Sequence, residues 1–168
     1  MSYYDKVGTY YDKDAVDFEQ RYHENPALQR IRQSFRQHTK SYEQTTVLEV
    51  GFGPGFDLVH FAEQFPDRKF YGIDISAEMV RLTQEKIDRM GLKNAWVAKG
   101  SVEDIKVLFP GVQFDMIYVF FGALNTVNDL EGAFVDLRVV LSSGGRMVLT
   151  FVNKYYIAGT LIELLKLK

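Results

Sequence analysis

The order of apolar and polar positions divides the chain into a polar helical part and a longer part built on short apolar runs. The first part covers residues 1–44, where no strand is predicted. Within it, Asn25 can cap a helix whose first position is Pro26. Apolar residues then recur at helical spacing, at Leu28, Ile31 and Phe35. We expect residues 1–44 to form a helical cap or lid.

From residue 45 onward, apolar runs alternate with amphipathic stretches. The runs predict five strands, at residues 45–50, 69–75, 95–100, 114–121 and 146–152. The amphipathic stretches predict helices at residues 55–65, 76–90, 103–109 and 128–141. This alternation is typical of parallel strands joined by right-handed crossovers, and uninterrupted apolar runs indicate a sheet covered on both faces. The sequence therefore predicts an α/β fold with a doubly wound, mostly parallel sheet at residues 45–152.

Spacing also predicts the buried faces of two of these helices. The apolar residues are Leu58, Phe61, Ala62 and Phe65 in the first, and Leu130, Phe134, Leu137 and Leu141 in the last. We expect "SSGG", residues 142–145, to turn the chain before the last strand. Residues 153–168 read as an apolar helix that packs on the protein, with lipid contact through its basic end as the lesser alternative. Because this stretch stops at "LLKLK", we expect a fragment of a longer protein.

Composition and charge narrow the class of protein. A length of 168 residues and a hydrophobic fraction of 46% suit one domain with a core. A formal net charge of -2 argues against a nucleic-acid binder, which would normally carry a basic excess. The absence of cysteine excludes disulfides, thiolate metal sites and a cysteine nucleophile, and no metal site is predicted. The start is too polar for a signal peptide and no apolar stretch could span a bilayer, so we expect a cytoplasmic protein.

A glycine cluster follows the first predicted strand in "VLEVGFGPGF", residues 47–56. Ligands of open α/β sheets bind at the carboxyl ends of the strands, and bare main chain there lets a ligand approach closely. The start of the next helix adds unpaired N–H groups. The dinucleotide pattern requires a third glycine where this chain has Phe56; Gly51 and Gly53 fit the first two places, and Gly55 comes one place early. The phosphate-binding loop of nucleotide hydrolases is excluded because no Gly-Lys-Ser/Thr follows.

Asp74 supplies the second ligand-binding feature. It lies at the end of the second predicted strand, in "GIDIS". A carboxylate at that place can accept two hydrogen bonds from a ribose diol. The alternative is an ordinary acidic start of the next helix, to which Ser76 and Glu78 would also contribute. The glycine cluster upstream favours the ribose role.

Five segments in order resemble the class I S-adenosylmethionine-dependent methyltransferases: "VLEVGFGPG", "GIDIS", "KGSVEDI", "FDMIYVF" and "LSSGGRMVLT". The resemblance covers residues 45–152. It implies a Rossmann-like methyltransferase fold and S-adenosylmethionine as the cofactor. It also implies two further strands after the fifth, one of them antiparallel. Nothing after Val152 reads like them, so we expect the last strands to be missing.

The resemblance assigns residues to each part of the cofactor. The acidic-glycine loop, which lies against the methionine half, corresponds to Glu49, Gly51, Gly53 and Gly55. Asp74 corresponds to the ribose-binding acid, and Ile75 and Met79 would lie against the adenine.

Three further residues follow from the same resemblance. Ser101 takes a place where many members carry an aspartate that accepts from the adenine amino group, and serine can accept that bond more weakly. Val102 would offer its backbone N–H to the ring. Phe120 would line the cofactor beside the transferable methyl group.

Methyl transfer depends mainly on alignment of the acceptor, so we expect no dedicated catalytic motif, and the sequence has none. The weak candidates are Tyr11 and Tyr22 as lid residues, His23 as a base and Asn125 as a group that orients the substrate. The segment "FFGALN" lacks the Asn-Pro-Pro-Tyr type of motif that marks methylation of amide and exocyclic amino groups. Together with the net charge, this favours a small-molecule substrate over a nucleic acid.

Two other functions stay open. A non-enzymatic module could keep the cofactor-binding fold for binding or assembly, and the absence of the last strands would be consistent with such a module. A nicotinamide-dependent oxidoreductase would use a similar sheet, but Phe56 and the lack of a Tyr–Lys pair after the fourth strand argue against it. The leading hypothesis is a methyltransferase that acts on an O, N or C atom of a small molecule. The sequence indicates neither the acceptor nor an oligomeric state.

Overall fold

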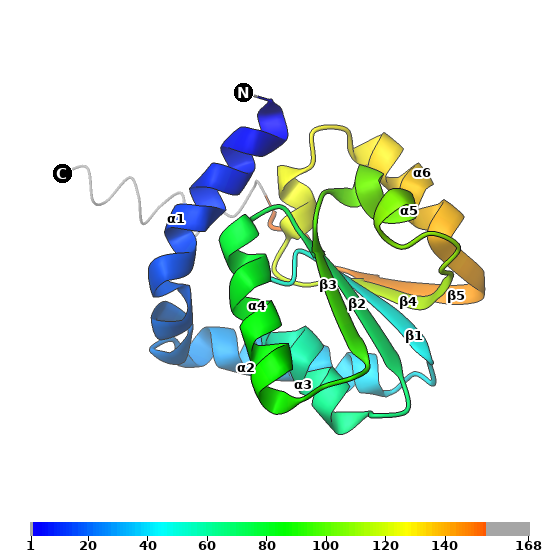
Figure 1. The fold of residues 1–168 in the computed structure, drawn as a ribbon, viewed down its shortest axis with the longest axis horizontal. Helices are drawn as coiled ribbons and strands as arrows, with labels where there is room; N and C mark the ends of the chain where they lie inside the picture. Colours follow the sequence, from blue (N-terminus) through cyan, green and yellow to red (C-terminus); the bar gives the residue numbers. More distant parts are fainter. Residues whose placement is uncertain (1, 154–168) are drawn as a thin grey trace.

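One parallel sheet organises the computed structural model, which describes residues 2–153. The five strands lie in the order β3-β2-β1-β4-β5, and every neighbouring pair is parallel (Figure 1). Their bounds are Thr46–Val50 (β1), Lys69–Asp74 (β2), Ala95–Lys99 (β3), Phe114–Val119 (β4) and Leu141–Leu149 (β5). The predicted α/β fold with a doubly wound parallel sheet is confirmed for the described residues.

Helices cover both faces of this sheet (Figure 1). The helices of the N-terminal part are α1 (Tyr3–His23) and α2 (Pro26–Lys40). The connections between strands hold α3 (Phe56–Gln64), α4 (Ala77–Met90), the 3-10 turn η1 (Val102–Asp104), α5 (Ile105–Leu108), the 3-10 turn η2 (Ala123–Thr126) and α6 (Leu130–Val140). As predicted, α2 begins at Pro26, and the side chain of Asn25 caps it by accepting hydrogen bonds from two backbone N–H groups.

The core has two parts, one on each face of the sheet. Successive side chains of a strand point to opposite faces, so Val47 and Leu48 of β1 belong to different clusters. Val47 packs with Leu58 and Phe61 of α3, whereas Leu48 packs with Leu137 of α6. The apolar face predicted for residues 55–65 is therefore confirmed at the positions that touch the sheet.

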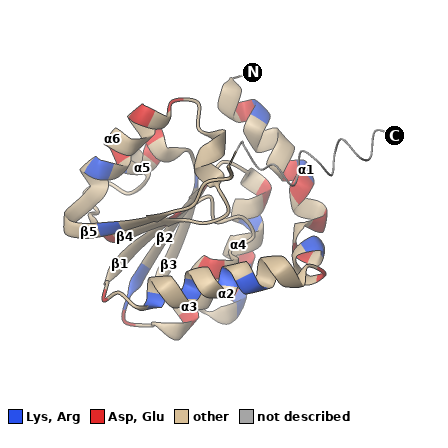
Figure 2. Cartoon of the chain, turned by 180° about the vertical axis from the view of Figure 1, so that it is seen from behind, with Lys and Arg blue, Asp and Glu red and all other residues tan. Residues whose placement is uncertain are grey.

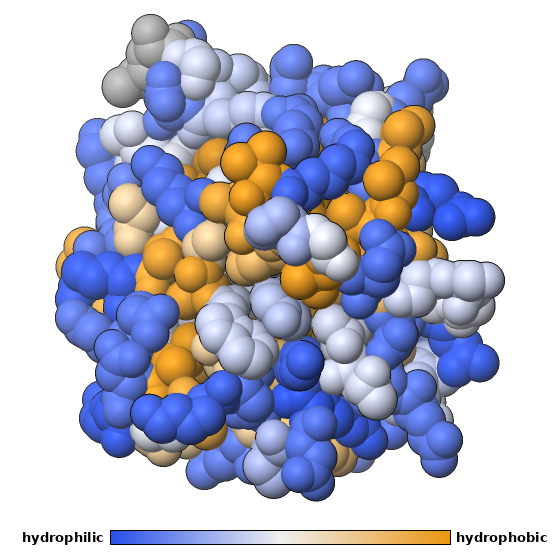
Figure 3. All heavy atoms as spheres, turned by 45° about the vertical axis from the view of Figure 1, so that its right-hand side comes forward, coloured by the Kyte–Doolittle hydropathy of each residue, from blue (hydrophilic) through white to orange (hydrophobic). Residues whose placement is uncertain are grey.

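The buried face predicted for α6 is wrong in part, since Leu137 is buried and Leu141 packs on the core as predicted. Leu130 and Phe134 are 40% and 37% exposed, and the buried residues are Ala133, Leu137 and Val140. Helix α6 carries two overlapping apolar stripes that share Leu137. The spacing of apolar residues does not determine which of the two stripes faces the sheet. Figure 3, in which the side of the molecule that carries α6 comes forward, shows several separate groups of apolar side chains among polar ones.

The face predicted for α2 is also wrong in part. Ile31 is 42% exposed, while Arg32 and Thr39 are buried. The burial of Arg32 depends on a partner from another helix, because its guanidinium forms an ion pair with the buried carboxylate of Asp57 in α3. Hydrophobic spacing within α2 carries no information about that partner.

The last strand begins earlier than predicted. Residues 142–145, expected to form a turn, lie within β5, where they form an irregularity in its pairing with β4. The register passes from Leu141 opposite Phe114 to Arg146 opposite Met116, so β5 carries extra residues there. Gly144, with φ 78°, provides the left-handed conformation that this detour needs. The helix predicted at residues 153–168 lies outside the described residues.

Helix α1 lies across the carboxyl ends of the strands and is fastened there by polar contacts. The Tyr4 hydroxyl donates to Glu103 Oε1 at 2.7 Å. The Asp12 carboxylate accepts from Ser76 Oγ at 2.6 Å and from the backbone N–H of Glu78 at 3.0 Å. Further along, Glu19 forms an ion pair with Lys86 of α4. Figure 1 shows α1 beside α4, so the N-terminal part packs directly on the α/β part.

Candidate cofactor site

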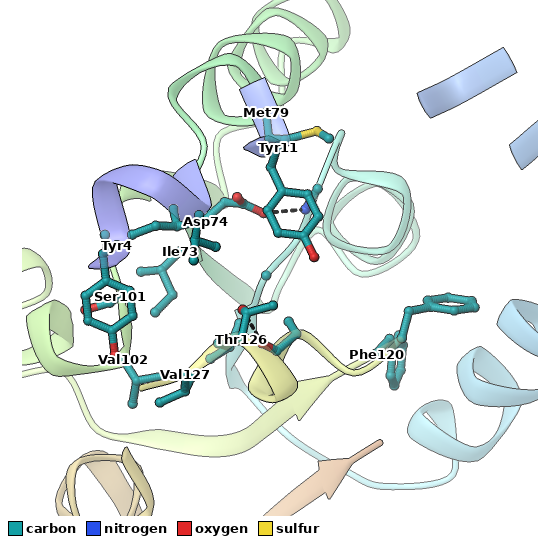
Figure 4. Close-up of a pocket in the computed structure, with 18 of the residues that line it drawn as sticks. Tyr4, Tyr11, Ile73, Asp74, Met79, Ser101, Val102, Phe120, Thr126 and Val127 are labelled. Carbon is teal, nitrogen blue, oxygen red and sulfur yellow. Dashed lines mark hydrogen bonds between the residues drawn. The ribbon is translucent and has the colours of Figure 1, made fainter. Parts of the chain in front are cut away.

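A cavity of about 240 Å³ lies between α1 and the carboxyl ends of β1, β2 and β4 (Figure 4). We call it the cofactor cavity. Nine residues proposed from the sequence line it: Tyr11, Gly51, Gly53, Asp74, Ile75, Met79, Ser101, Val102 and Phe120. After β1 the chain continues to β2, which lies on one side of β1 in the sheet, whereas β4 lies on the other side of β1. This point of reversal is where open α/β sheets bind ligands.

The glycine cluster forms the floor of this cavity. Gly51 and Gly53 have φ values of 71° and 56°, in the left-handed region that favours glycine. A Cβ added at Gly51 would lie 2.3 Å from the Cβ of Ala123, whereas one added at Gly53 would meet no atom within 4 Å. Gly51 therefore serves close packing, and Gly53 leaves bare main chain beside open space.

Gly55 has a different position from the one the sequence indicated. It does not line the cofactor cavity, and a Cβ there would lie 2.5 Å from Cγ2 of Thr83 in α4. The Thr83 hydroxyl donates to the backbone carbonyl of Gly53 at 3.0 Å. Gly55 thus lets α4 approach the loop closely enough for Thr83 to hold it.

Asp74 is fixed by the main chain on both sides. Its Oδ2 accepts from the N–H of Gly53 at 2.8 Å, and its Oδ1 accepts from the N–H of Ser76 at 2.9 Å. Only 8% of the residue is exposed, and burial raises the pKa of the carboxyl to about 6 despite these two bonds. A carboxylate has about four acceptor sites, so Asp74, which lines the cavity, keeps some acceptor capacity.

Ser101 and Val102 begin the 3-10 turn η1 at the edge of the cavity. Asp104 Oδ2 accepts from both the Ser101 hydroxyl at 3.0 Å and the backbone N–H of Ser101 at 2.8 Å, and the Ser101 side chain accepts in return from the backbone of Asp104. This capping box uses the proton of the Ser101 hydroxyl and one of its two lone pairs, which leaves one lone pair. Val102 is buried and contributes an apolar surface.

The apolar wall of the cavity includes Ile75, Met79, Phe120 and a residue that sequence reasoning missed, Phe121. Phe121 has φ 56°, the only positive φ of a non-glycine residue among those the structure describes. Such a conformation costs about 1–3 kcal/mol and is concentrated at functional sites. Glycine would adopt this conformation at position 121 without strain, but in "FFG" the chain places its glycine one position later.

Glu49 lies in the sheet outside the cavity wall. It is 2% exposed, and its Oε2 accepts from the Tyr118 hydroxyl at 2.8 Å. Burial raises the pKa of its carboxyl to about 8, although the positive charges of Arg32 and Arg36 partly oppose this. Glu49 thus lies in β1, directly before the glycine cluster, and its side chain lies near the arginines of α2.

The four weak candidates for catalysis lie in different places. Tyr11 lines the cofactor cavity, and Figure 4 shows its ring beside Asp74 with the hydroxyl pointing into the middle of the cavity. Tyr22 and His23 lie at the end of α1 and line another cavity. The Asn125 amide is bound to the backbone of Val152, donating at 3.2 Å and accepting at 2.9 Å, so it joins η2 to the segment after β5.

Within the range of residues 2–153, no group of three or more His, Cys, Asp or Glu side chains is arranged to hold a metal ion. None of the helices described in it combines the length and the apolar character needed to cross a membrane.

Comparisons with known proteins agree with the geometry. Residues 41–167 match the family described as "Methyltransferase domain". A tRNA (guanine-N(7)-)-methyltransferase of Edwardsiella ictaluri is 35% identical over 80 residues, which are 47% of this chain and 34% of that protein. A malonyl-[acyl-carrier protein] O-methyltransferase of Ilyobacter polytropus is 31% identical over 117 residues, 69% of this chain and 41% of that protein. The chain thus spans about a third of the first relative and two fifths of the second.

Solved structures share the fold. The DhpI–SAH complex superposes with a TM-score of 0.69 at 20% sequence identity, and the match covers 88% of this chain and 68% of that one. The family match includes the glycine cluster, Asp74 and every described strand. The resemblance to class I methyltransferases is therefore confirmed, and the chain belongs to the methyltransferase domain family, with the Rossmann-like fold of the S-adenosylmethionine-dependent enzymes.

Proposed function

We propose that this chain binds S-adenosylmethionine in the cofactor cavity and catalyses transfer of its methyl group to a small molecule. One observation carries the proposal. A buried carboxylate, Asp74, is held by the N–H of Gly53 at the point where the strand order reverses. Bare main chain and a fixed acceptor therefore border the same cavity.

The residues present fit this cofactor. Open space lies beside Gly53 where any other residue would carry a Cβ. Asp74 has acceptor capacity for a ribose diol, and Met79 and Ile75 offer apolar surface for an adenine ring. When bound, the cofactor supplies an electrophilic methyl group on a sulfonium, and the protein supplies alignment.

The roles of the chain's own residues follow from their positions. Helix α1 covers one side of the cavity and would limit the access of water to a bound acceptor. Burial raises the pKa of Tyr11, so its hydroxyl stays protonated at neutral pH and can orient an acceptor by donating a hydrogen bond. We assign no general base, and an acceptor atom that is already nucleophilic needs none.

The choice of a small-molecule acceptor rests on the chain's own charge. A net charge of -2 is a poor match for a polyanion, and a malonyl-[acyl-carrier protein] O-methyltransferase, which does not act on a nucleic acid by its name, is among its relatives. A second candidate is an RNA base, because several relatives are methyltransferases of tRNA or ribosomal RNA. These relatives match over only part of their length, so the acceptor class needs its own experiment.

Cofactor binding is tested by thermal denaturation and calorimetry with S-adenosylhomocysteine, the demethylated product, and with NAD. We expect the first to raise the melting temperature and NAD to leave it unchanged. Asp74→Asn should lose the effect, whereas Asp67→Asn, at an exposed aspartate away from the cavity, should keep it. Stabilisation by NAD, or an unchanged affinity of Asp74→Asn for S-adenosylhomocysteine, would reject the proposal.

The acceptor class is tested with methyl-labelled S-adenosylmethionine and a cell extract. We expect label in the small-molecule fraction, with no effect of ribonuclease. Label that precipitates with RNA and is released by ribonuclease would support the second candidate instead. Labelling with neither would favour a module that binds the cofactor without catalysing transfer.

A further inference from the structure

A second cavity, of about 560 Å³, lies between the end of α1, the length of α2 and the start of α3. We call it the basic cavity. Its wall includes His23, Arg32, Arg36, Lys40 and His60, and no acidic side chain is among its described lining residues. Neither binding of the cofactor nor alignment of its methyl group uses these residues.

The charge of this cavity comes from α2. The helix holds Arg30, Arg32, Arg36 and Lys40 but no aspartate or glutamate, although the whole chain has a net charge of -2. Figure 2 shows these basic positions recurring along α2. Arg32, Arg36 and Lys40 follow one another at intervals of four residues, which places them on one face of the helix.

The nearby carboxyl groups do not balance this charge. Asp57 is fully buried and accepts from both Arg32 and Arg36, the latter through Nε at 2.6 Å. A second buried acid near these arginines, Glu49, has its pKa raised to about 8 and accepts a hydrogen bond from Tyr118. One ionised carboxylate therefore stands opposite two guanidinium groups and the ammonium of Lys40.

One hydrogen-bond donor among these basic side chains also has no partner. Arg32 Nε is buried and has no hydrogen-bond partner among the described residues. The Arg32 guanidinium lies over three aromatic rings, 4.7 Å from the centre of Tyr22, 4.9 Å from Phe56 and 4.5 Å from Phe121. These rings surround the guanidinium group that carries the unpaired donor.

The basic cavity adjoins the cofactor cavity. Phe121 lines the cofactor cavity, and the ring of Phe121 packs on Arg32, which lines the basic cavity. A single layer of side chains therefore separates the two. An acceptor that extends past Phe121 from the cofactor cavity would therefore meet the basic face of α2.

We propose that the basic cavity binds an oxyanion, a carboxylate or phosphate group, carried by the methyl acceptor. This deepens the proposed methyl transfer and rests on it. Guanidinium groups match the paired oxygens of such anions, and Lys40 adds a point charge at the rim. A compact anion suits the site better than a nucleic-acid backbone, since the charge lies in a hollow and the chain as a whole is acidic.

The test uses the histidines as reporters in NMR titrations with inorganic phosphate and with acetate. Burial and the positive charges of Arg36 and Lys40 lower the pKa of His60 to about 4. At pH 7 the His60 ring is therefore neutral, and phosphate or acetate bound beside these groups at saturation should shift its ring resonances. The ring resonances of His38, which hydrogen-bonds to Tyr42 and lines neither cavity, should not shift.

A matched pair of variants locates the anion. Lys40→Gln should weaken binding roughly two- to fivefold, as expected for an exposed ion pair. Arg30→Gln removes the same charge from the same helix but outside the lining of the basic cavity, and should leave binding unchanged. Both positions are exposed, so loss of folding should not confuse the comparison. Equal effects of the two variants would mean general attraction to α2 and would overturn the proposal.

Further arms separate the sources of the anion. The stronger of phosphate and acetate indicates which group the acceptor carries. No shift at His60 with either anion, but a shift with tRNA at matched ionic strength, would overturn the proposal in favour of an RNA backbone. No shift with any of the three would overturn it outright. Titration of the same samples with S-adenosylhomocysteine keeps this result apart from the proposed function, since either ligand can bind without the other.

Discussion

Replacing single glycines by alanine separates the part of the glycine cluster that packs from the part that faces a ligand. Gly51 and Gly53 both have positive φ, so an alanine at either costs about 1–2 kcal/mol of folding free energy through strain alone. The two positions differ in what the added methyl group meets. At Gly51 it lies 2.3 Å from the Cβ of Ala123, whereas at Gly53 it enters open space.

The expected magnitudes follow from these surroundings. Carbon atoms pack at about 3.5–4.0 Å, so Gly51→Ala forces a shift that adds roughly 1–3 kcal/mol to the strain. Gly53→Ala should lose only the strain, which corresponds to a fall in melting temperature of roughly 2–8 °C. Gly111→Ala is the matched control, because Gly111 also has positive φ, has open space around it and lines neither cavity.

Calorimetric titration with S-adenosylhomocysteine then tests the ligand role, and urea denaturation measures stability. Gly53→Ala and Gly111→Ala should be about equally stable, but only Gly53→Ala should lose binding, by at least about tenfold. A Gly53→Ala protein that binds as tightly as the wild type would refute the close approach of a ligand to this main chain. Equal stability of Gly51→Ala and Gly53→Ala would refute the packing role of Gly51.

Three other measurements probe the site and its supports. Burial raises the pKa of Asp74 to about 6, and the ionised carboxylate is the better hydrogen-bond acceptor. The affinity for S-adenosylhomocysteine should therefore fall as the pH drops below 6, approaching tenfold per pH unit. An affinity that does not change from pH 7 to 5 would contradict this role of Asp74. Tyr4→Phe removes the 2.7 Å bond to Glu103 that holds α1 down, so stopped-flow dissociation of the same ligand should become roughly two- to tenfold faster; an unchanged rate would mean that α1 need not move. Asn94→Ala removes donors to three backbone carbonyls at 3.0–3.1 Å and should cost about 1–3 kcal/mol in urea denaturation, whereas a loss below about 0.5 kcal/mol would show that water replaces them.

Much of the fold could be predicted because local chemistry and tertiary structure agree there. Asn25 and Pro26 begin a helix through their own side chains, and the strands are apolar runs because both faces of the sheet are covered. The pairing of Asp74 with the glycine cluster also followed, since parallel strands bring their carboxyl ends to one edge. The face of α6 did not follow, because two stripes of similar hydrophobicity share Leu137.

The parts of the site that were missed depend on contacts between distant segments. The burial of Arg32 depends on Asp57, and the place of Gly55 depends on Thr83 of another helix. The sequence predicts Asn125 as a polar residue at the rim of a cavity, but in the structure its amide is hydrogen-bonded to the backbone of Val152. The basic face of α2 did leave a signal, namely a spacing of four residues between positive charges in a helix without acids.

The position of β1 in the sheet has a consequence for synthesis of the chain. Val47 pairs with Phe70 of β2 on one side and with Met116 of β4 on the other. A ribosome completes the first partner soon after β1, but β4 only after α4, β3 and α5. Until then one edge of the central strand, and the apolar surface that α6 later covers, have no neighbour. We expect nascent chains that stop before β4 to bind chaperones or aggregate, and the finished chain to fold slowly for its size because this central pairing joins distant segments.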